Sequence, residues 1–186
     1  MSYEDENNVA LYLSGDEAGL HALIHTYTKT VYGYIRHMVA TKSDAEDLTQ
    51  ETFIKVWKHI KKYKQGQGFK TWLFTIAHNT TIDHLRKRKS YVFSDFEKEN
   101  GNNTVTENIK DTEPLPDELF DQVKNAKQMK HLLEDVSPMY KEVLLLHYQD
   151  ELTFDEIGTV LGKPLNTVKS HHQRALIELR KRIKED

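Results

Sequence analysis

The sequence lacks cysteine altogether and is poor in proline and glycine. Its 186 residues include no cysteine, four prolines and eight glycines. The absence of cysteine excludes a disulfide scaffold, a thiolate zinc site and a cysteine nucleophile, and it fits a reducing compartment. No apolar run approaches the roughly 18 residues needed to cross a bilayer, and the polar, acidic start from Met1 to Asn8 is unlike a signal peptide. We therefore expect a soluble, cytoplasmic protein without membrane insertion.

Charge is distributed unevenly along the chain. The net charge is -3, yet residues 55–89 carry ten basic residues against one acidic residue, and residues 163–186 carry seven against three. Between these blocks, residues 90–121 carry nine acidic and two basic residues. Two basic blocks separated by acid indicate two contacts with one polyanion, such as a nucleic acid, although a basic block can also be a solvated helix face.

Apolar residues recur at steps of three and four, which predicts helices, and strand signals are weak throughout. The spacings of Ser14 with Glu17 and of Ser43 with Glu46 have the form of capping boxes at helix starts. The fold class is therefore predicted to be all-α. The expected helices before the last motif lie over residues 20–38, as one helix or a helix pair, and over residues 44–61, 70–89, 123–136 and 139–148.

Residues 90–120 differ from the rest of the chain. They include Gly101, Pro114 and Pro116, they are acidic, and they lack a sustained apolar stripe. This composition is typical of a flexible linker, the alternative being an ordered loop packed on a domain. The chain is accordingly expected to form two small helical domains, residues 1–89 and 121–186, joined by the linker.

The C-terminal part has the pattern of a helix-turn-helix. Thr153 and Glu156 form a capping box before a short helix, Gly162 suits the left-handed conformation that ends it, and a basic helix begins near Asn166. In this motif the early residues of the second helix face the major groove of DNA. An ordinary helical hairpin is the structural alternative. The candidate DNA contacts are Asn166, Thr167, Lys169, Ser170, His171, Gln173 and Arg174.

Three segments resemble those of bacterial RNA polymerase sigma factors. The string D-A-E-D-L-T-Q-E-T-F-I-K-V-W, residues 44–57, resembles their core-binding segment. The string F-K-T-W-L-F-T-I-A-H-N-T-T-I-D-H-L-R-K-R-K, residues 69–89, resembles the segment that melts and recognises the promoter, and residues 140–170 resemble the second conserved domain. The short length and two-domain layout are similar to the extracytoplasmic function (ECF) group.

The resemblance implies a promoter-specificity factor with no chemistry, cofactor or metal of its own. Its implied partners are core RNA polymerase, through the clamp coiled coil and the flap, promoter DNA, and an anti-sigma factor. The helix over 44–61 would bind the clamp. Its outer face carries acidic residues and an exposed isoleucine, a combination suited to docking another protein. The residues on that face are Asp47, Gln50, Glu51 and Ile54.

Contacts with the minus-ten element are expected in residues 61–89. Aromatic faces and amide groups can receive unstacked bases, at about 1–3 kcal/mol per stacked base. The basic cluster that ends this segment would bind phosphates, with an affinity that falls as salt rises. The candidates for bases are Tyr63, Phe69, Trp72 and Asn79, and those for phosphates are Arg86, Lys87, Arg88 and Lys89. The last helix would read the minus-thirty-five element, where the run His171-His172-Gln173 departs from the residues typical of the family and leaves the base preference open.

Two other functions are compatible with parts of the chain. A stand-alone helix-turn-helix regulator would explain the C-terminal motif but not residues 44–89. A metal-dependent hydrolase would need clustered ligands, but His78 and His84 are six residues apart and do not share a helix face, and no zinc-protease spacing or phosphate loop is present.

Overall fold

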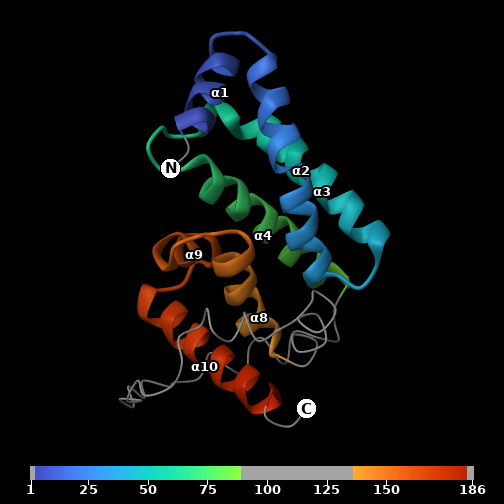
Figure 1. Ribbon diagram of the computed structural model, residues 1–186. Helices are drawn as coiled ribbons and strands as arrows, with labels where there is room; N and C mark the ends of the chain where they lie inside the picture. The colour runs from blue at the N-terminus through green and yellow to red at the C-terminus, as the bar shows by residue number, and fades with distance from the viewer. Residues whose placement is uncertain (1–2, 89–135, 184–186) are drawn as a thin grey trace.

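The computed structural model describes residues 3–88 and 136–183, and its regular elements in these ranges are all helical (Figure 1). The first range forms α1 (Tyr3–Leu13), α2 (Ala18–Met38), α3 (Lys42–His59) with a 3-10 turn (Ile60–Lys62), and α4 (Phe69–Arg88). The second forms α8 (Pro138–Leu144) with a π-helical turn (Leu145–Gln149), α9 (Phe154–Leu161) and α10 (Leu165–Ile183). The all-α prediction is confirmed. The expected linker over 90–120, most of the expected helix over 123–136, and Lys89 lie outside the described residues.

Helix α1 was not predicted from the sequence pattern, because its apolar stripe is short. It is held by the buried Val9 and by two acidic side chains: the buried Asp5 accepts a 2.6 Å hydrogen bond from the Tyr27 hydroxyl, and Glu6 accepts one from Tyr63. Gly19 of α2 permits this close packing, because a Cβ there would lie 2.1 Å from the carbonyl oxygen of Asn8. Polar contacts to tyrosines thus fix α1 against the rest of the first domain.

The first two predicted capping boxes are wrong in detail. Ser14 donates to the carbonyl of Leu11 at the end of α1, and the Asp16 carboxylate accepts from the N–H of Ala18 at the start of α2. At α3, the side chain of Thr41 rather than Ser43 accepts from the N–H of Asp44, so the helix begins at Lys42. In each case a nearby polar side chain satisfies the free helix N–H groups, and spacing alone does not select among such side chains.

The helix-turn-helix is confirmed. Thr153 and Glu156 form a complete capping box, and Gly162 ends α9 with a left-handed φ of 63°. Gly158 lies against the turn, because a Cβ there would approach the carbonyl oxygen of Lys163 to 2.8 Å. Both glycines are therefore required by the tight path between α9 and α10.

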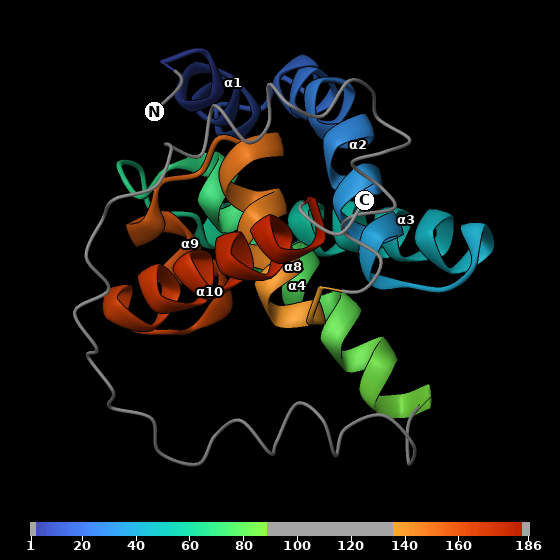
Figure 2. The same ribbon diagram turned by 60° about the horizontal axis from the view of Figure 1, so that its bottom comes forward.

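A single apolar core joins the two halves of the chain. Leu73 and Phe74 of α4 belong to the same buried cluster as Val143, Leu146 and Ile157 from the second half. Helix α9 packs directly against α4, as Figures 1 and 2 show from two directions. A second, smaller cluster lies between α8 and α10. The two helical units are thus packed together in this structure.

We predict that Gly158→Ala destabilises the helix-turn-helix, because the added methyl group would overlap the Lys163 carbonyl. Overpacking of this kind costs about 1–3 kcal/mol. Urea unfolding followed by circular dichroism would measure the loss. The exposed neighbour Thr159 offers a matched control, and equal stability of Gly158→Ala and Thr159→Ala would contradict the predicted clash.

Candidate nucleic-acid and protein interfaces

The outer face of α3 is exposed, acidic and partly apolar. Asp47, Gln50 and Glu51 are all exposed, and the side chain of Ile54 remains 49% exposed. The opposite side of the helix is buried in the core through residues such as Leu48 and Val56. The structure therefore places the four residues predicted to bind the clamp together on one free face.

Trp57 extends this face, and the sequence reasoning did not include it among the site residues. It is 56% exposed, which is unusual for the largest side chain in the protein. Its position three residues after Ile54 places both on the same side of α3. Trp57 could have been identified from its spacing, because Gln50, Ile54 and Trp57 are four and three residues apart and so lie on one side of a helix.

Helix α4 carries a polar stripe that includes Trp72 and Asn79. Asn79 is exposed, whereas Trp72 is half-buried and packs on two other rings. The Trp72 ring centroid lies 5.4 Å from that of Tyr63 and 5.8 Å from that of Phe69. One part of the tryptophan is thus fixed by packing and the other reaches the surface.

Two residues predicted to contact bases are buried. Phe69 is 2% exposed and Tyr63 is 7% exposed, and the Tyr63 hydroxyl donates to Glu6 of α1. Burial and the hydrogen bond to Glu6 raise the pKa of Tyr63. Both rings fill the space between α1, α2 and the start of α4, which leaves no free aromatic face for a base. In this arrangement they position Trp72.

The C-terminal end of α4 is basic. Arg86, Lys87 and Arg88 are exposed. Arg88 forms an ion pair with Asp44 at the start of α3, and His84 lies 3.8 Å from the same carboxylate. The Asp44 pKa is lowered by a hydrogen bond with Thr41 and then by the contact with Arg88. Arg88 therefore also ties α4 to α3.

The predicted DNA-reading residues of α10 divide into an outer and an inner set. Asn166, Lys169 and Gln173 are exposed and share one face of the helix. Thr167, Ser170 and Arg174 are half-buried at its edges, and Arg174 donates a 3.3 Å hydrogen bond to the Tyr140 hydroxyl. His171 is buried, with its ring 5.4 Å from that of Tyr140. The structure thus turns His171 toward α8 and away from the outer face.

His172 is also buried, in a group of rings from three elements. Its Nε2 atom lies 3.0 Å from the Tyr148 hydroxyl, and its ring packs on Phe154 at 4.9 Å and on His147 at 5.4 Å. Burial, and then the nearby His147, lower the pKa of His172 to about 4. The ring is neutral near pH 7 and serves the packing of α10 on α9.

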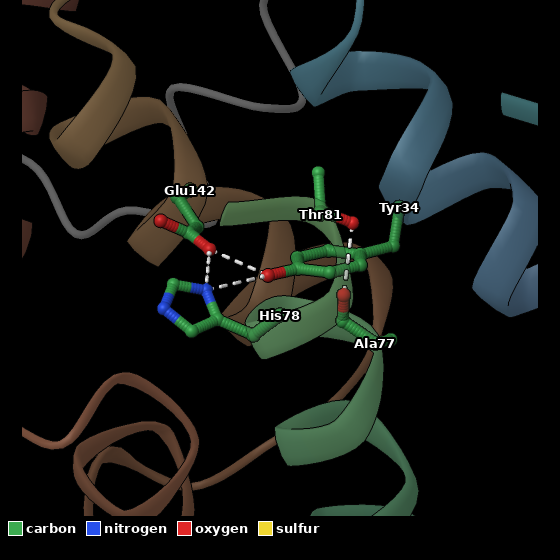
Figure 3. A network of polar contacts seen from close by, with 5 residues as sticks. All are labelled: Tyr34, Ala77, His78, Thr81 and Glu142. Carbon is green, nitrogen blue, oxygen red and sulfur yellow. Dashed lines mark hydrogen bonds and ion pairs between the residues drawn. The ribbon is translucent and has the colours of Figure 1, made fainter. Parts of the chain in front are cut away.

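A shared carboxylate connects the two halves of the chain (Figure 3). Glu142 of α8 accepts a 2.5 Å hydrogen bond from the Tyr34 hydroxyl of α2, and the same oxygen lies 2.7 Å from Nδ1 of His78 in α4. The Tyr34 hydroxyl and His78 Nδ1 are 3.2 Å apart. Nearby, Thr71 of α4 donates a 3.2 Å hydrogen bond to Glu156 of α9.

Asp150 places an electrostatically unfavourable buried carboxylate in the region where the two halves meet. It is 1% exposed, and no group within the described residues forms a hydrogen bond with its carboxylate. Burial raises the pKa of Asp150 to about 7, against an opposing effect of Lys70. An unpaired buried carboxylate of this kind is costly when it is charged.

Within residues 3–88 and 136–183, no group of three or more possible ligands could hold a metal ion. In the same residues no helix is long and apolar enough to span a membrane. His78 and His84, considered in the hydrolase hypothesis, have separate partners in Glu142 and Asp44.

The chain matches two protein-family models and several known proteins. Residues 23–91 match the family model for Sigma-70 region 2, and residues 126–179 match that for Sigma-70, region 4. The chain is 30% identical over 172 residues to the ECF RNA polymerase sigma factor SigW of Bacillus subtilis, covering 92% of each protein. It is 28% identical to the RNA polymerase sigma-H factor of Pseudomonas aeruginosa, covering 92% of this chain and 90% of the relative.

Two solved structures share the fold. The structure of CnrH in complex with the cytosolic domain of CnrY superposes with a TM-score of 0.69 at 19% identity, covering 98% of this chain and 99% of the other. The sigma factor RpoE of Bartonella quintana, solved with the anti-sigma factor NepR, gives a TM-score of 0.64 at 21% identity, covering 89% and 97%.

Asp150 leads to a prediction about the pH dependence of stability. Its folded pKa of about 7 lies above the ordinary value of 3.8. Between these values the unfolded chain loses the proton that the folded chain retains, so stability falls as pH rises through this window. Asp150→Asn removes the buried charge and should raise the free energy of unfolding at pH 8 by about 1–3 kcal/mol, because part of the gain is offset by desolvation of the amide.

Denaturant unfolding at pH 8 and at pH 4 would measure this effect. The gain should shrink toward pH 4, where the folded wild-type chain keeps the carboxyl protonated and so carries no buried charge at Asp150. Asp155→Asn, at an exposed position on α9, serves as the matched control. A pH-independent difference between Asp150→Asn and wild type would show that the buried carboxyl is not the titrating group.

Proposed function

The chain belongs to the ECF RNA polymerase sigma factors, and from this premise we propose which of its surfaces makes each contact in transcription initiation. As a sigma factor, it directs core RNA polymerase to promoters. We assign residues 1–89 to core binding and to recognition and melting of the minus-ten element, and residues 121–186 to the minus-thirty-five element. Residues 90–120 link these domains. Polymerase supplies the catalysis, and the chain works in the cytoplasm.

The outer face of α3 is proposed to bind the clamp coiled coil of the polymerase. Its acidic residues Asp47 and Glu51 can pair with basic groups, while Ile54 and Trp57 offer apolar area that no other part of the described chain covers. Aromatic and apolar side chains surrounded by charges are typical of the central contacts in protein interfaces. This exposed mixed face is the observation on which the proposal chiefly depends. The flap of the polymerase would contact the second domain.

The polar stripe of α4 is proposed to hold the melted minus-ten element. Trp72 can stack on an unpaired base, Asn79 can form hydrogen bonds with a base edge, and Arg86 and Lys87 can contact phosphates. Arg88 and Lys89 complete the basic cluster. Phe69 and Tyr63 pack against Trp72 from the buried side, so their contribution to DNA binding is expected to be indirect.

The outer face of α10 is proposed to read the minus-thirty-five element in the major groove. Asn166 and Gln173 carry amide groups suited to base edges, and Lys169 can bind a phosphate or a guanine. Thr167, Ser170 and Arg174 flank this face, and His171 supports it from the buried side.

An anti-sigma factor is the proposed regulator. The related folds of CnrH and of Bartonella quintana RpoE were solved with the cytosolic domain of CnrY and with the anti-sigma factor NepR, respectively. The apolar part of the α3 face is an available surface for a similar partner here, because Ile54 and Trp57 are exposed in the free chain.

Run-off transcription with core polymerase tests the proposed function directly, and Ile54→Glu tests the α3 face. The substitution places a charge at the centre of the proposed contact, so the affinity for core polymerase should fall at least about tenfold, in the range of an interface hot spot. Leu11→Glu is a matched control, because Leu11 is an exposed leucine on α1 that lies outside the proposed face. Equal core binding by both variants would refute the assignment of α3.

Lys169→Ala tests the α10 face. Removing one phosphate contact should weaken promoter binding by the polymerase complex several-fold and reduce the slope of log affinity against log salt by about 1. Lys29→Ala, at an exposed position on α2, is the control. An unchanged salt slope for Lys169→Ala would exclude Lys169 from the DNA interface.

A further inference from the structure

We propose that α1 takes part in promoter melting, because its acidic residues Glu6 and Asp5 position Trp72, the side chain assigned to stack on an unpaired base. Neither acid has to touch DNA for this role. Each acts through a tyrosine that belongs to the same group of packed rings as Trp72. This inference rests on the proposed function, because it concerns how the DNA-binding stripe of α4 is held ready.

Glu6 is linked to Trp72 through Tyr63. The carboxylate of Glu6 accepts a hydrogen bond from the Tyr63 hydroxyl, and the centroid of the Tyr63 ring lies 5.4 Å from that of Trp72. Tyr63 is 7% exposed, so its hydroxyl has to find an acceptor inside the protein. Removal of Glu6 would leave this buried hydroxyl without its acceptor and would free the ring to change its orientation.

The same hydroxyl holds the loop that leads into α4. This loop contains Gly66 and Gly68, whose φ angles of 90° and 80° lie in the left-handed region. The backbone of Gly68 also hydrogen-bonds to the Tyr63 hydroxyl, and the Gly68 carbonyl accepts a 3.1 Å hydrogen bond from the N–H of Trp72. Because glycine leaves the loop backbone permissive, the contacts at its ends set the path into α4. Glu6 therefore acts on both the ring and the backbone of Trp72.

Asp5 provides a second connection from α1 to the same rings. It is 7% exposed and accepts a 2.6 Å hydrogen bond from Tyr27 of α2. The Tyr27 ring lies 5.8 Å from that of Phe69, and the Phe69 ring lies 5.8 Å from that of Trp72. Tilted rings packed at these distances restrict one another's orientation. Two carboxylates of α1 thus hold one ring group, which consists of Tyr27, Tyr63, Phe69 and Trp72.

The exposed part of the ring group belongs to Trp72. Tyr27, Tyr63 and Phe69 are buried, whereas Trp72 is half-buried and reaches the surface. A ring that is already fixed in a receptive orientation loses less conformational freedom when a base stacks on it. Acidic side chains are themselves unsuited to contact DNA, because phosphates repel them. The hydrogen bonds of Asp5 and Glu6 to tyrosines therefore give α1 a positioning role.

Glu6→Ala and Tyr63→Phe test this role, because they remove the acceptor and the donor of the same hydrogen bond. Two quantities are measured for each full-length variant: the affinity for core polymerase, and the rate of open-complex formation on a promoter saturated with the polymerase complex. We expect the rate to fall about tenfold, within the range given by loss of one base stack. Core affinity should stay unchanged, because the proposed polymerase contact lies on α3.

Glu6→Gln separates positioning from charge. Its amide oxygen can still accept the hydrogen bond from Tyr63, whereas Glu6→Ala has no acceptor. Loss of a negative charge near DNA favours DNA binding by itself, so charge alone predicts that neither variant melts the promoter more slowly. Positioning predicts slow melting in Glu6→Ala and recovery in Glu6→Gln. Glu4→Ala is the matched control, because Glu4 is an exposed acid in the same turn of α1.

The fluorescence of Trp72 reports the position of the ring itself. The protein has two tryptophans, so Trp57→Phe leaves Trp72 as the only one in the free chain. In this background, Glu6→Ala and Tyr63→Phe should increase the quenching of Trp72 by acrylamide, and Glu6→Gln should not. The double variant with both Glu6→Ala and Tyr63→Phe should add no further change, because both substitutions remove the same contact.

Each outcome bears on the proposal. Slow open-complex formation and increased quenching in Glu6→Ala, with recovery of both in Glu6→Gln, support it. Wild-type rates in Glu6→Ala and Tyr63→Phe overturn it, as does an equal loss in Glu6→Ala and Glu6→Gln. Circular dichroism identifies a variant that does not fold. If Glu6→Ala is such a variant, Tyr63→Phe decides the test, because it keeps the ring and loses only the hydroxyl.

Trp72→Ala distinguishes failure of this inference from failure of the proposed function. If Trp72→Ala melts the promoter at the wild-type rate, the proposed base contact of α4 fails and the role of α1 fails with it. If Trp72→Ala is slow while Glu6→Ala and Tyr63→Phe are not, the base contact stands and only the positioning role of α1 is overturned.

Discussion

The buried carboxylate of Glu142 is the constraint on which the arrangement of the chain depends. A carboxylate in an apolar setting must receive hydrogen bonds, and here its donors come from Tyr34 of α2 and His78 of α4. Satisfying one acid therefore brings α8 onto two helices of the first domain. The same docking places α9 on α4 and continues the apolar core across both domains.

In this arrangement some helix faces are exposed to solvent, and others are buried in the contact between the two domains. The outer faces of α3 and α10 are exposed in this structure, with Ile54 and Lys169 at the surface. Helix α4, by contrast, serves two purposes, because one flank packs on α9 while the next carries Trp72 and Asn79. In this structure the exposed faces of α3 and α10 are therefore both accessible while α9 remains packed on α4.

Local features were predicted from the sequence because they depend on neighbouring residues. The capping box of Thr153, the turn at Gly162 and the helices that became α3, α4, α9 and α10 all follow from spacing and intrinsic conformational preferences. Features that depend on distant partners were not predicted. Helix α1 is fixed by tyrosines from other elements, and the choice of Thr41 over Ser43 as a cap depends on the path of the preceding loop.

In the candidate site, too, features set by neighbouring residues were predicted and features set by distant partners were not. Periodicity correctly placed Asp47, Gln50, Glu51 and Ile54 on one face, because the opposite face of α3 is regularly apolar. It could not show that Phe69 and His171 are buried, since aromatic and histidine side chains occur both in cores and at nucleic-acid contacts. The contact of Glu142 with Tyr34 and His78 could not be predicted either, because nothing in the sequence distinguishes these residues until tertiary packing brings them together.

The distance between the two domains in the free chain tests this account most directly. The absence of cysteine allows spin labels to be attached only at introduced positions, such as Glu46→Cys on α3 and Thr159→Cys on α9, both exposed. Double electron–electron resonance on the free protein should give one narrow distance, because Glu142 and the shared apolar core hold α8 and α9 on the first domain. A broad distance distribution in the free chain would contradict an arrangement held by Glu142.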